Sequence, residues 1–270
     1  MKRLIFLFFI FSFSLFNYSQ ACTNLIVSRG ASADGSTFIT YAADSHTRYG
    51  QLRFCPAADH SQGDMLKLYN YGSLKFQLEI EQPAHTYQVV GFINEHQLAM
   101  GETTWGGISP LDKGNAEGID YGNLIYVALQ RARNCREAIK VMHELVSTYG
   151  YAEGGESFSI ADPNEVWIFE ITSKGHFEKG AVWVARRVPD GYICGPANQA
   201  RITTFPWEVK KSYKSISSKN IKYIDRPEVE CVYSDDVAAF ARKQGLYSGT
   251  DADPLVSNIL NGGGANLKHR

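Results

Sequence analysis

The stretch Cys22-Thr23-Asn24-Leu25-Ile26-Val27-Ser28 begins the part of this chain that has the pattern of a folded domain. Its alternation and its β-branched residues predict a strand. The next residues, Gly30-Ala31-Ser32-Ala33-Asp34-Gly35, have the chemistry of a turn, and Ser36-Thr37-Phe38-Ile39-Thr40-Tyr41 returns to a strand pattern. We therefore expect a β-hairpin to open the domain, with Cys22 at its first position.

Residues 1–21, which precede this hairpin, have the three regions of a secretory signal. A positively charged start is followed by the apolar run Leu4–Phe16, which is too short for a comfortable membrane span. Ser19 and Ala21 occupy the two small-residue positions before a cut. We expect cleavage after Ala21, which makes Cys22 the first residue of a secreted or periplasmic protein.

Two other roles of Cys22 have to be weighed against a free thiol. A cysteine at such a cut is the lipid-attachment site of a lipoprotein, and only in that case would this protein have a membrane partner. Lipid-attachment sites usually carry a Leu-like residue three positions before the cysteine and a small residue two before, whereas Ser19 and Gln20 stand there. Cys22 is alternatively the first residue of a buried strand, since free cysteine often packs as a small hydrophobic residue.

Composition places the chain among globular proteins and excludes several functions. With 270 residues, 44% of them hydrophobic, residues 22–270 suffice for one domain. The 27 Lys and Arg nearly balance the 28 Asp and Glu, so nucleic acid is not an expected partner. An odd number of cysteines leaves at least one thiol unpaired in an oxidising compartment. No zinc-type spacing joins them, so we expect neither a metal nor another cofactor; they are Cys22, Cys55, Cys135, Cys194 and Cys231.

The pattern of the remaining chain predicts further strands and a helical pair. Strands are expected at 87–94, 98–104, 157–161, 166–172 and 181–188. One helix is expected over 123–133, and a second follows Asn134, which forms a capping pattern with Glu137 three residues later. A polar helical tail is expected around 234–244. This order predicts an α+β fold with helices packed on antiparallel sheets.

A series of motifs resembles one enzyme family. Cys22-Thr23, Ala31-Ser32-Ala33-Asp34-Gly35-Ser36 and Asp44 resemble the opening of the cysteine dipeptidases of the N-terminal-nucleophile class, relatives of secernin and more distantly of penicillin V acylase and bile-salt hydrolase. Further motifs follow in the family's order: Asn94-Glu95-His96, Gly101-Glu102-Thr103-Thr104, Tyr151, Ser159-Ile160-Ala161-Asp162-Pro163, Ala185-Arg186-Arg187-Val188-Pro189-Asp190-Gly191 and Ala197-Asn198-Gln199-Ala200-Arg201-Ile202. Such a series is specific, although any one motif alone would be weak.

The resemblance covers roughly Cys22 to Leu255 and implies a fold. It implies four αββα layers, in which two stacked sheets lie between helical layers and the nucleophile begins a central strand. Members of the dipeptidase family usually run well beyond Leu255, so we expect the C-terminal part of the fold to be truncated in this chain.

An N-terminal cysteine can supply both the nucleophile and its base. The α-amine has a reference pKa of about 7.7–8.0, which suits it to accept the thiol proton near neutral pH. The thiolate of Cys22 would attack a substrate carbonyl and form a thioester that water resolves. By resemblance, Asn198 would stabilise the oxyanion and Thr104 lies near a second polar position of the same group. The alternative interpretation of Asn198 is a turn residue after Gly195-Pro196.

The other candidate site residues carry charge. Asp44 would orient the α-amine, although from sequence alone it is equally a turn residue at a strand end. Penicillin V acylases and many dipeptidase relatives carry an Arg three residues before this Asp; here it is Tyr41, so Arg201 is a candidate replacement cation. Glu102 would read the free amino terminus of a substrate, or would pair with a structural Arg.

The sequence therefore predicts a secreted cysteine dipeptidase that hydrolyses short peptides, and it leaves the oligomeric state open. Two alternatives remain. The first is an N-acyl amide hydrolase of the choloylglycine or penicillin V acylase type. The second is a lipid-anchored surface protein without catalytic activity.

Overall fold

The computed structural model describes residues 22–44, 50, 52–105, 107, 111, 118–209 and 212–247, together with the backbone of residues 255–257. The expected signal segment, residues 1–21, lies outside the described residues. Within them the chain folds into helices and largely antiparallel sheets, which confirms the α+β class. None of the helices in this part of the chain is long and apolar enough to cross a membrane.

The predicted opening hairpin is present. β1 (Cys22–Val27) and β2 (Phe38–Ala43) pair antiparallel, with the short 3-10 helix η1 (Arg29–Ala31) in the turn between them. β14 (Ile193–Cys194) pairs with the other edge of β1 and completes a three-stranded sheet in the order β14-β1-β2. A Cβ on Gly30 would lie 2.9 Å from the backbone nitrogen of Gly191, so this close approach of the turn to the segment before β14 requires glycine.

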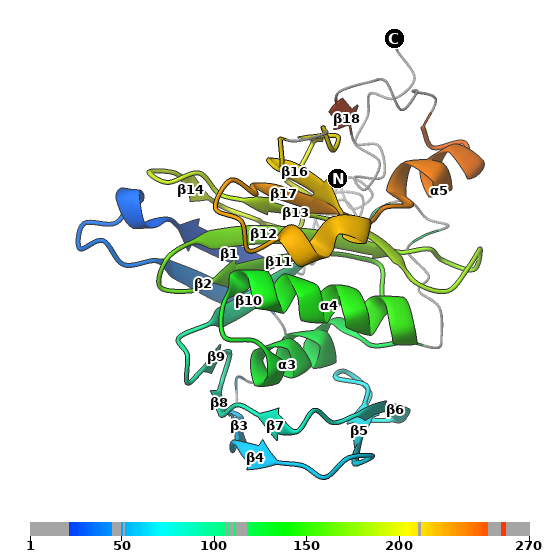
Figure 1. Ribbon diagram of the computed structural model, residues 1–270. Helices are drawn as coiled ribbons and strands as arrows, with labels where there is room; N and C mark the ends of the chain where they lie inside the picture. The colour runs from blue at the N-terminus through cyan, green and yellow to red at the C-terminus, as the bar shows by residue number, and fades with distance from the viewer. Residues whose placement is uncertain are drawn as a thin grey trace, which may run out of the picture.

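A nine-stranded sheet forms the centre of the molecule, in the order β16-β17-β13-β12-β11-β10-β9-β8-β3 (Figure 1). Every pair in it is antiparallel except β16 with β17. The two middle strands, β11 and β12, are buried along their whole length, as expected of a sheet covered on both faces. The strands are β10 (Ala99–Trp105), β11 (Gly155–Ala161), β12 (Val166–Ser173), β13 (Ala181–Arg187), β17 (Cys231–Tyr233), β16 (Ser215–Ser217), β9 (Ile93–Asn94), β8 (Val89–Val90) and β3 (Phe54–Cys55).

Four of the five further strands predicted from sequence are confirmed as β10 to β13, whereas the prediction of one strand over 87–94 is wrong. That segment contains β8 and β9, which pair with each other through a two-residue turn. Gly91 in the turn has a φ of +59°, a conformation that glycine adopts without steric cost. The glycine therefore breaks the strand that the apolar pattern predicted.

The two predicted helices are α3 (Tyr121–Arg131) and α4 (Cys135–Tyr149), and both cover one face of the large sheet (Figure 1). The side chain of Asp120 accepts from the Asn123 N–H at the start of α3. The expected cap of α4 is confirmed, since Asn134 Oδ1 accepts from the Glu137 N–H at 2.9 Å. Capping thus fixes where each helix begins, and a common apolar cluster holds both helices on the sheet.

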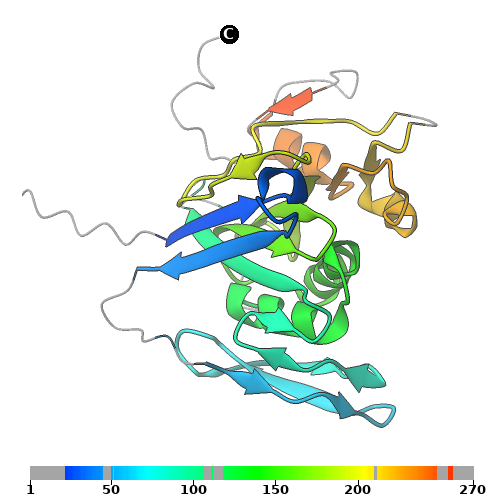
Figure 2. The ribbon, with the colours of Figure 1, turned by 90° about the vertical axis from the view of Figure 1, so that its left-hand side faces the viewer.

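The opposite face of the large sheet packs against the hairpin. β1 and β2 contact β10 and β11, and Ile26 belongs to a second apolar cluster with Ile168 and Val184. Figure 2, turned by 90°, shows the blue hairpin beside the strands of the large sheet. The described residues therefore stack as a helix layer, the nine-stranded sheet and the three-stranded sheet.

Shorter elements surround these layers. Two antiparallel strand pairs lie beyond α3 (Figure 1): the hairpin of β5 (Met65–Tyr69) with β6 (Phe76–Glu81), and β4 (Ala58–Asp59) with β7 (His85–Thr86), the strands on either side of that hairpin in the chain. The predicted helical tail is present as α5 (Val237–Lys243). The remaining elements are the 3-10 helix η2 (Ser218–Tyr223) and the pair β15 (Thr204–Pro206) with β18 (Leu255–Ser257).

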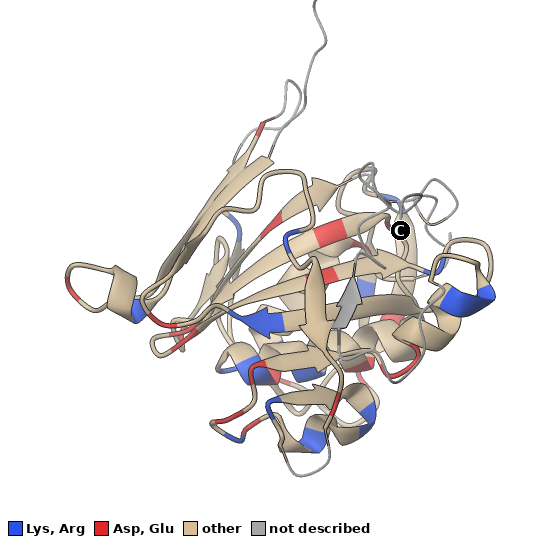
Figure 3. Ribbon diagram, turned by 90° about the horizontal axis from the view of Figure 1, so that it is seen from above, with Lys and Arg blue, Asp and Glu red and all other residues tan. Residues whose placement is uncertain are grey.

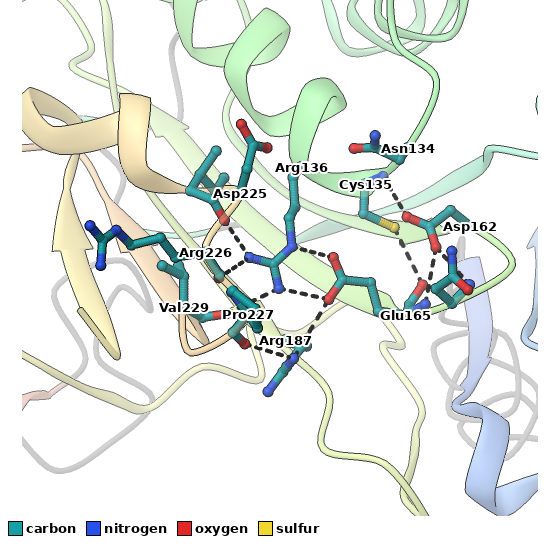
Figure 4. Close-up of polar contacts among 12 residues, drawn as sticks. Asn134, Cys135, Arg136, Asp162, Glu165, Arg187, Asp225, Arg226, Pro227 and Val229 are labelled. Atoms are coloured by element: carbon teal, nitrogen blue, oxygen red, sulfur yellow. Dashed lines mark hydrogen bonds and ion pairs between the residues drawn. The ribbon is translucent and has the colours of Figure 1, made fainter. Parts of the chain in front are cut away.

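An ion-pair network fastens the start of α4 to the turn between β11 and β12 (Figure 4). Arg136 binds both carboxylate oxygens of Glu165, with Nε–Oε1 at 2.6 Å and the other guanidinium nitrogen at 2.9 Å. It also donates to the Arg226 carbonyl at 2.8 Å. Next to it, Asp162 accepts the N–H of Cys135 at 2.8 Å. These bonds join three segments that lie far apart in the sequence.

Candidate active site around Cys22

The backbone nitrogen of Cys22 lies at the meeting point of β1 and a distant loop. It donates to Asn198 Oδ1 at 2.5 Å, and two residues along β1 the Asn24 N–H donates to the Pro196 carbonyl at 2.9 Å. In the full chain this nitrogen belongs to a peptide bond. Removal of residues 1–21 would convert it into an α-amine already in contact with Asn198.

The thiol of Cys22 is half-buried and carries its proton at neutral pH. Burial raises its pKa most, and the negative charge of Glu102 raises it further. Backbone N–H groups of Asp44 and Thr104 face the sulfur and act in the opposite direction, but the pKa stays above its ordinary value. A thiol of this kind needs a base to become a nucleophile.

Asn198 adopts a left-handed backbone conformation, with a φ of +49°, which asparagine tolerates better than most residues. Its Oδ1 accepts from the Cys22 nitrogen, and its Nδ2 donates to the Thr104 carbonyl. One donor and one acceptor therefore fix the orientation of the amide. The Asn198 side chain thus links Cys22 to β10.

Glu170 on β12 holds the loop that carries Asn198. Its two oxygens accept the backbone N–H groups of Arg201 and Ile202, the second at 3.0 Å, and Ser157 Oγ donates to it at 3.1 Å. The side chain is fully buried, and burial raises its pKa although these donors lower it. Sequence reasoning missed Glu170, yet an acidic residue inside the apolar strand VWIFEITS is a signal that could have found it.

The predicted residue Arg201 lies in the same loop but contributes mainly its backbone. Its guanidinium Nε donates to the Gly195 carbonyl at 3.0 Å, and the residue is exposed. Asp44, at the end of β2, is also exposed. In the described part of the chain no hydrogen bond joins the Asp44 carboxylate to the Cys22 nitrogen, although its backbone N–H faces the thiol.

A second group of side chains surrounds Glu102 on the helix-side face of the sheet. Tyr41 Oη donates to Glu102 Oε1 at 2.6 Å. Thr104 pairs across the ladder with Glu156, and its hydroxyl lies 2.8 Å from Glu156 Oε1 and 3.5 Å from Glu102 Oε2. Within the described ranges no Lys or Arg forms an ion pair with either glutamate.

Glu102 and Glu156 are both 2% exposed and behave as a pair. Burial, and then the adjacent charge of Glu102, raises the pKa of Glu156 far above its ordinary value. The raised pKa keeps Glu156 protonated at neutral pH. Sequence reasoning missed Glu156, whose role depends on its cross-strand neighbour Thr104.

No group of three His, Cys, Asp or Glu residues that could hold a metal occurs among the described residues. Figure 3 shows acidic segments in red both on central strands and on the surrounding loops. A surface hollow of about 610 Å³ lies elsewhere, lined by residues of the outer hairpins and of α3 and α4 that include His60, Arg131 and Tyr149. It contains none of the residues around Cys22, so the chemistry of the thiol is not centred there.

Comparison with known proteins adds a family to this geometry. The model of Peptidase family C69 matches residues 21–259, a range that begins one residue before Cys22.

Three curated proteins illustrate the similarity. A probable dipeptidase of Latilactobacillus sakei is 29% identical over 72% of this chain and 42% of its own length. Probable dipeptidase A of Streptococcus pyogenes serotype M3 is 28% identical over 80% of this chain and 48% of its own length. A probable dipeptidase of Salmonella dublin is 28% identical over 84% and 50%. The chain thus spans about half the length of the curated relatives it matches.

Proposed function

This chain belongs to peptidase family C69, and from that premise we propose that it is a cysteine dipeptidase whose nucleophile is Cys22. The observation that carries the proposal is the contact between the Cys22 nitrogen and Asn198 at 2.5 Å. This contact places the amide side chain of Asn198 beside the Cys22 nitrogen, which cleavage would convert into an α-amine, and beside the thiol of the same residue. The names of the matched relatives support peptides as the substrates.

We propose that maturation removes residues 1–21 and exports the protein. Cleavage after Ala21 would turn the Cys22 nitrogen into an α-amine with a reference pKa of about 7.7–8.0. Such an amine can accept the thiol proton, which the raised pKa of the thiol otherwise retains. Lipid attachment to the same cysteine is the competing outcome, and it would leave the protein anchored to a membrane.

In the proposed reaction the Cys22 proton passes to the α-amine, directly or through water, while Sγ bonds to the substrate carbonyl carbon. The protonated α-amine then gives that proton to the leaving nitrogen as the carbon–nitrogen bond breaks, and a thioester remains. A water molecule attacks the thioester and loses its proton through the α-amine to the departing sulfur. The free acid leaves and Cys22 is regenerated.

The oxyanion needs donors beside the thiol. We propose Asn198 Nδ2 and the backbone N–H of Thr104, which already faces the sulfur. Asn198 Nδ2 donates to the Thr104 carbonyl, so it would have to turn from that oxygen to reach the oxyanion. Asp44, whose charge also acts on the thiol, would orient the α-amine once that amine is free.

We also propose the four-layer αββα architecture, with a helical layer on the outer face of the sheet β14-β1-β2. The apolar side chains that this sheet exposes support it: Leu25 is 39% exposed, Phe38 43% and Ile193 57%. A sheet face of this composition is normally covered.

The decisive experiment combines mass spectrometry of the mature protein with a hydrolysis assay. A mass that fits an unmodified chain beginning at Cys22, together with cleavage of unmodified dipeptides, would support the proposal. An added diacylglyceryl group, or a mature chain that begins elsewhere, would contradict it. Faster cleavage of N-acyl amino acids than of dipeptides would favour the acylase alternative instead.

A further inference from the structure

We propose that Asn24 is a positioning residue for the reaction of Cys22: its buried side chain holds the start of β1 where the Cys22 nitrogen meets Asn198. This inference rests on the proposed peptidase function, because it concerns the geometry of the same proposed nucleophile. Its basis is the hydrogen bonds of Asn24, its burial and the close packing of β10 against it.

The side chain of Asn24 faces the large sheet together with that of Cys22. The two residues are two positions apart on β1, and side chains two apart in a strand point to the same face. Asn24 Nδ2 donates to Ser159 Oγ on β11 at 3.0 Å, and neither Asn24 nor Ser159 has any exposed surface. This bond therefore anchors β1 to a central strand of the large sheet next to Cys22.

The backbone of Asn24 holds the loop that carries Asn198. Its N–H donates to the Pro196 carbonyl at 2.9 Å. Two residues toward the start of β1, the Cys22 nitrogen donates to Asn198 Oδ1, so both bonds continue the antiparallel register in which β1 pairs with β14. A displacement of Asn24 would therefore be passed on to the contact between Cys22 and Asn198.

β10 comes close to the Asn24 amide because residue 101 is a glycine. A Cβ on Gly101 would lie 3.3 Å from Asn24 Nδ2 and 3.0 Å from the Cβ of Tyr41, the cross-strand neighbour of Asn24 in β2. Glycine in a strand often marks a close approach of this kind. The glycine thus lets the Asn24 side chain lie directly on β10 while it bonds to Ser159.

Stability alone does not favour an amide at this position. Asn24 Oδ1 has no hydrogen-bond partner in the part of the chain that the structure describes, and a buried polar atom without a partner costs free energy. Ile26, the next residue on the same face of β1, belongs to the apolar cluster between the two sheets. Leucine has a similar branched shape and would extend that cluster. What the amide adds is a directional bond to Ser159, which defines the position of β1.

The position of β1 matters because the thiol, its proposed base and the proposed oxyanion donor have to lie at the right distances from one another. A misplacement of about 1 Å can cost on the order of 10²-fold in rate. The Asn24 side chain bonds to β11 and not to the groups that react, so it acts through the position of β1. We therefore expect a lower kcat at an almost unchanged KM when this bond is lost.

The test measures kcat and KM of dipeptide hydrolysis by the mature protein, together with its melting temperature. Asn24→Leu should lower kcat about 10- to 100-fold and leave KM within about twofold. The melting temperature should stay within about 3 °C of the wild type, because an apolar side chain replaces an incompletely bonded amide.

Ser159→Ala removes the same hydrogen bond from the other strand. It should lower kcat about fivefold, as the loss of one neutral hydrogen bond does. The double variant Asn24→Leu with Ser159→Ala should be no slower than Asn24→Leu alone, because the bond is already absent. Independent losses in the double variant would show that Asn24 does not act through Ser159, which would overturn the proposal.

Asn123 on α3 is the matched control, a buried asparagine whose bonds do not involve β1. Its Nδ2 donates to the Tyr69 carbonyl at 2.8 Å and joins α3 to β5. Asn123→Ala should lower the melting temperature more than Asn24→Leu does, and kcat per folded molecule should stay normal. An equal loss of kcat in Asn123→Ala would mean that Asn24 acts only through general stability.

Alkylation of Cys22 by iodoacetamide, followed by mass spectrometry of the peptide that contains it, reports the position of β1 without turnover. The Thr104 N–H faces the sulfur and lowers the thiol pKa. In Asn24→Leu the displaced sulfur should lose this donor, so the pH of half-maximal alkylation should rise relative to the wild type, whereas Asn123→Ala should leave it unchanged.

The proposal is wrong if Asn24→Leu folds and keeps both the wild-type kcat and the wild-type alkylation profile. A wild-type protein that hydrolyses no dipeptide would instead overturn the proposed peptidase function. In that case the alkylation profiles alone decide whether Asn24 positions the thiol.

Discussion

Acidic side chains lie near both ends of β11, and the two groups differ in their hydrogen-bond and ion-pair partners. Beyond the C-terminal end of the strand, Glu165 receives two hydrogen bonds from Arg136, and Arg187 lies 3.7 Å away (Figure 4). Asp162 accepts three backbone N–H groups. Here the carboxylate oxygens accept hydrogen bonds from a guanidinium group and from backbone N–H groups.

Near the N-terminal end, Glu156 and Glu102 have hydroxyl neighbours, and Glu156 Oε2 has no partner among the described residues. A satisfied network of charges is what a fold uses to fasten its segments. Among the described residues, the carboxyl groups of Glu102 and Glu156 belong to no such network of ion pairs. The contrast teaches that ion pairs and backbone N–H groups satisfy the acids at the C-terminal end of β11, whereas hydroxyl groups contact the buried acids near its N-terminal end.

The sharpest way to break this comparison is to remove the thiol of Cys22, the proposed nucleophile. Cys22→Ser should lower peptide hydrolysis on the order of 10⁴-fold or more, as removal of a catalytic nucleophile does in other enzymes. Thermal unfolding should stay within about 1 °C of the wild type, since the change replaces one half-buried atom. Full activity in the serine variant would refute the proposed mechanism.

A change in the ion pair of Arg136 with Glu165 should lower stability and leave hydrolysis unchanged. Arg136→Ala leaves the Glu165 carboxylate, whose side chain is only 16% exposed, without its bidentate partner. We expect a loss of about 3–5 kcal/mol in the free energy of unfolding, measured by chemical denaturation, with normal hydrolysis per folded molecule.

The double variant Arg136→Met with Glu165→Met is the control for this prediction. Replacing both charges by apolar residues should recover most of the stability, because no unpaired buried charge remains. If Arg136→Ala reduced hydrolysis without reducing stability, the division between the two ends of β11 would be wrong.

Glu170 tests whether a fully bonded carboxylate can serve catalysis indirectly. Glu170→Gln cannot accept both the Arg201 and the Ile202 N–H, so the loop that carries Asn198 should shift. A misplacement of about 1 Å can cost on the order of 10²-fold in rate, and we expect kcat to fall about 10- to 100-fold.

Glu208 provides the matched control for Glu170. It also holds a backbone N–H, that of Ser217 at 3.1 Å, but it does not bind the Asn198 loop. Glu208→Gln should lower the melting temperature while kcat stays normal. A similar loss of kcat in both variants would show that Glu170 acts only through general stability.

The sequence was sufficient to predict the elements that local chemistry determines. The opening hairpin followed from alternation and turn residues, and α4 from the cap of Asn134 with Glu137. Gly91 shows the limit, because the apolar pattern of 87–94 did not reveal a turn with positive φ. The four long strands were predicted because their apolar patterns persist over five or more residues.

Among the candidate site residues, the sequence could predict only those that lie in the family's motifs. Cys22 and Asn198 meet across 176 residues, and no periodicity predicts such a contact. Glu170 and Glu156 were missed because an acidic residue in a strand has meaning only through partners that the fold supplies, here Ile202 and Thr104. Motif order pointed to Cys22, whereas the residues that surround it follow only from the sheet register.

The smallest effect concerns the pH dependence of stability, and it separates the two ends of β11 without any substrate. The folded pKa of Glu156 is raised above its unfolded value, first by burial and then by Glu102. Its contribution is therefore fully present below the unfolded pKa and is lost as pH rises toward the folded one, by at most about 1.4 kcal/mol per pH unit. Melting temperatures between pH 5 and 8 should fall with rising pH in the wild type and fall less steeply in Glu156→Gln.

Because Arg136 pairs with Glu165 at the other end, the control Glu165→Gln should lower stability at every pH in this range and leave the slope unchanged. An equal slope in wild type and Glu156→Gln would mean that the carboxyl pair does not hold a proton, which would remove the asymmetry between Glu102 and Glu156.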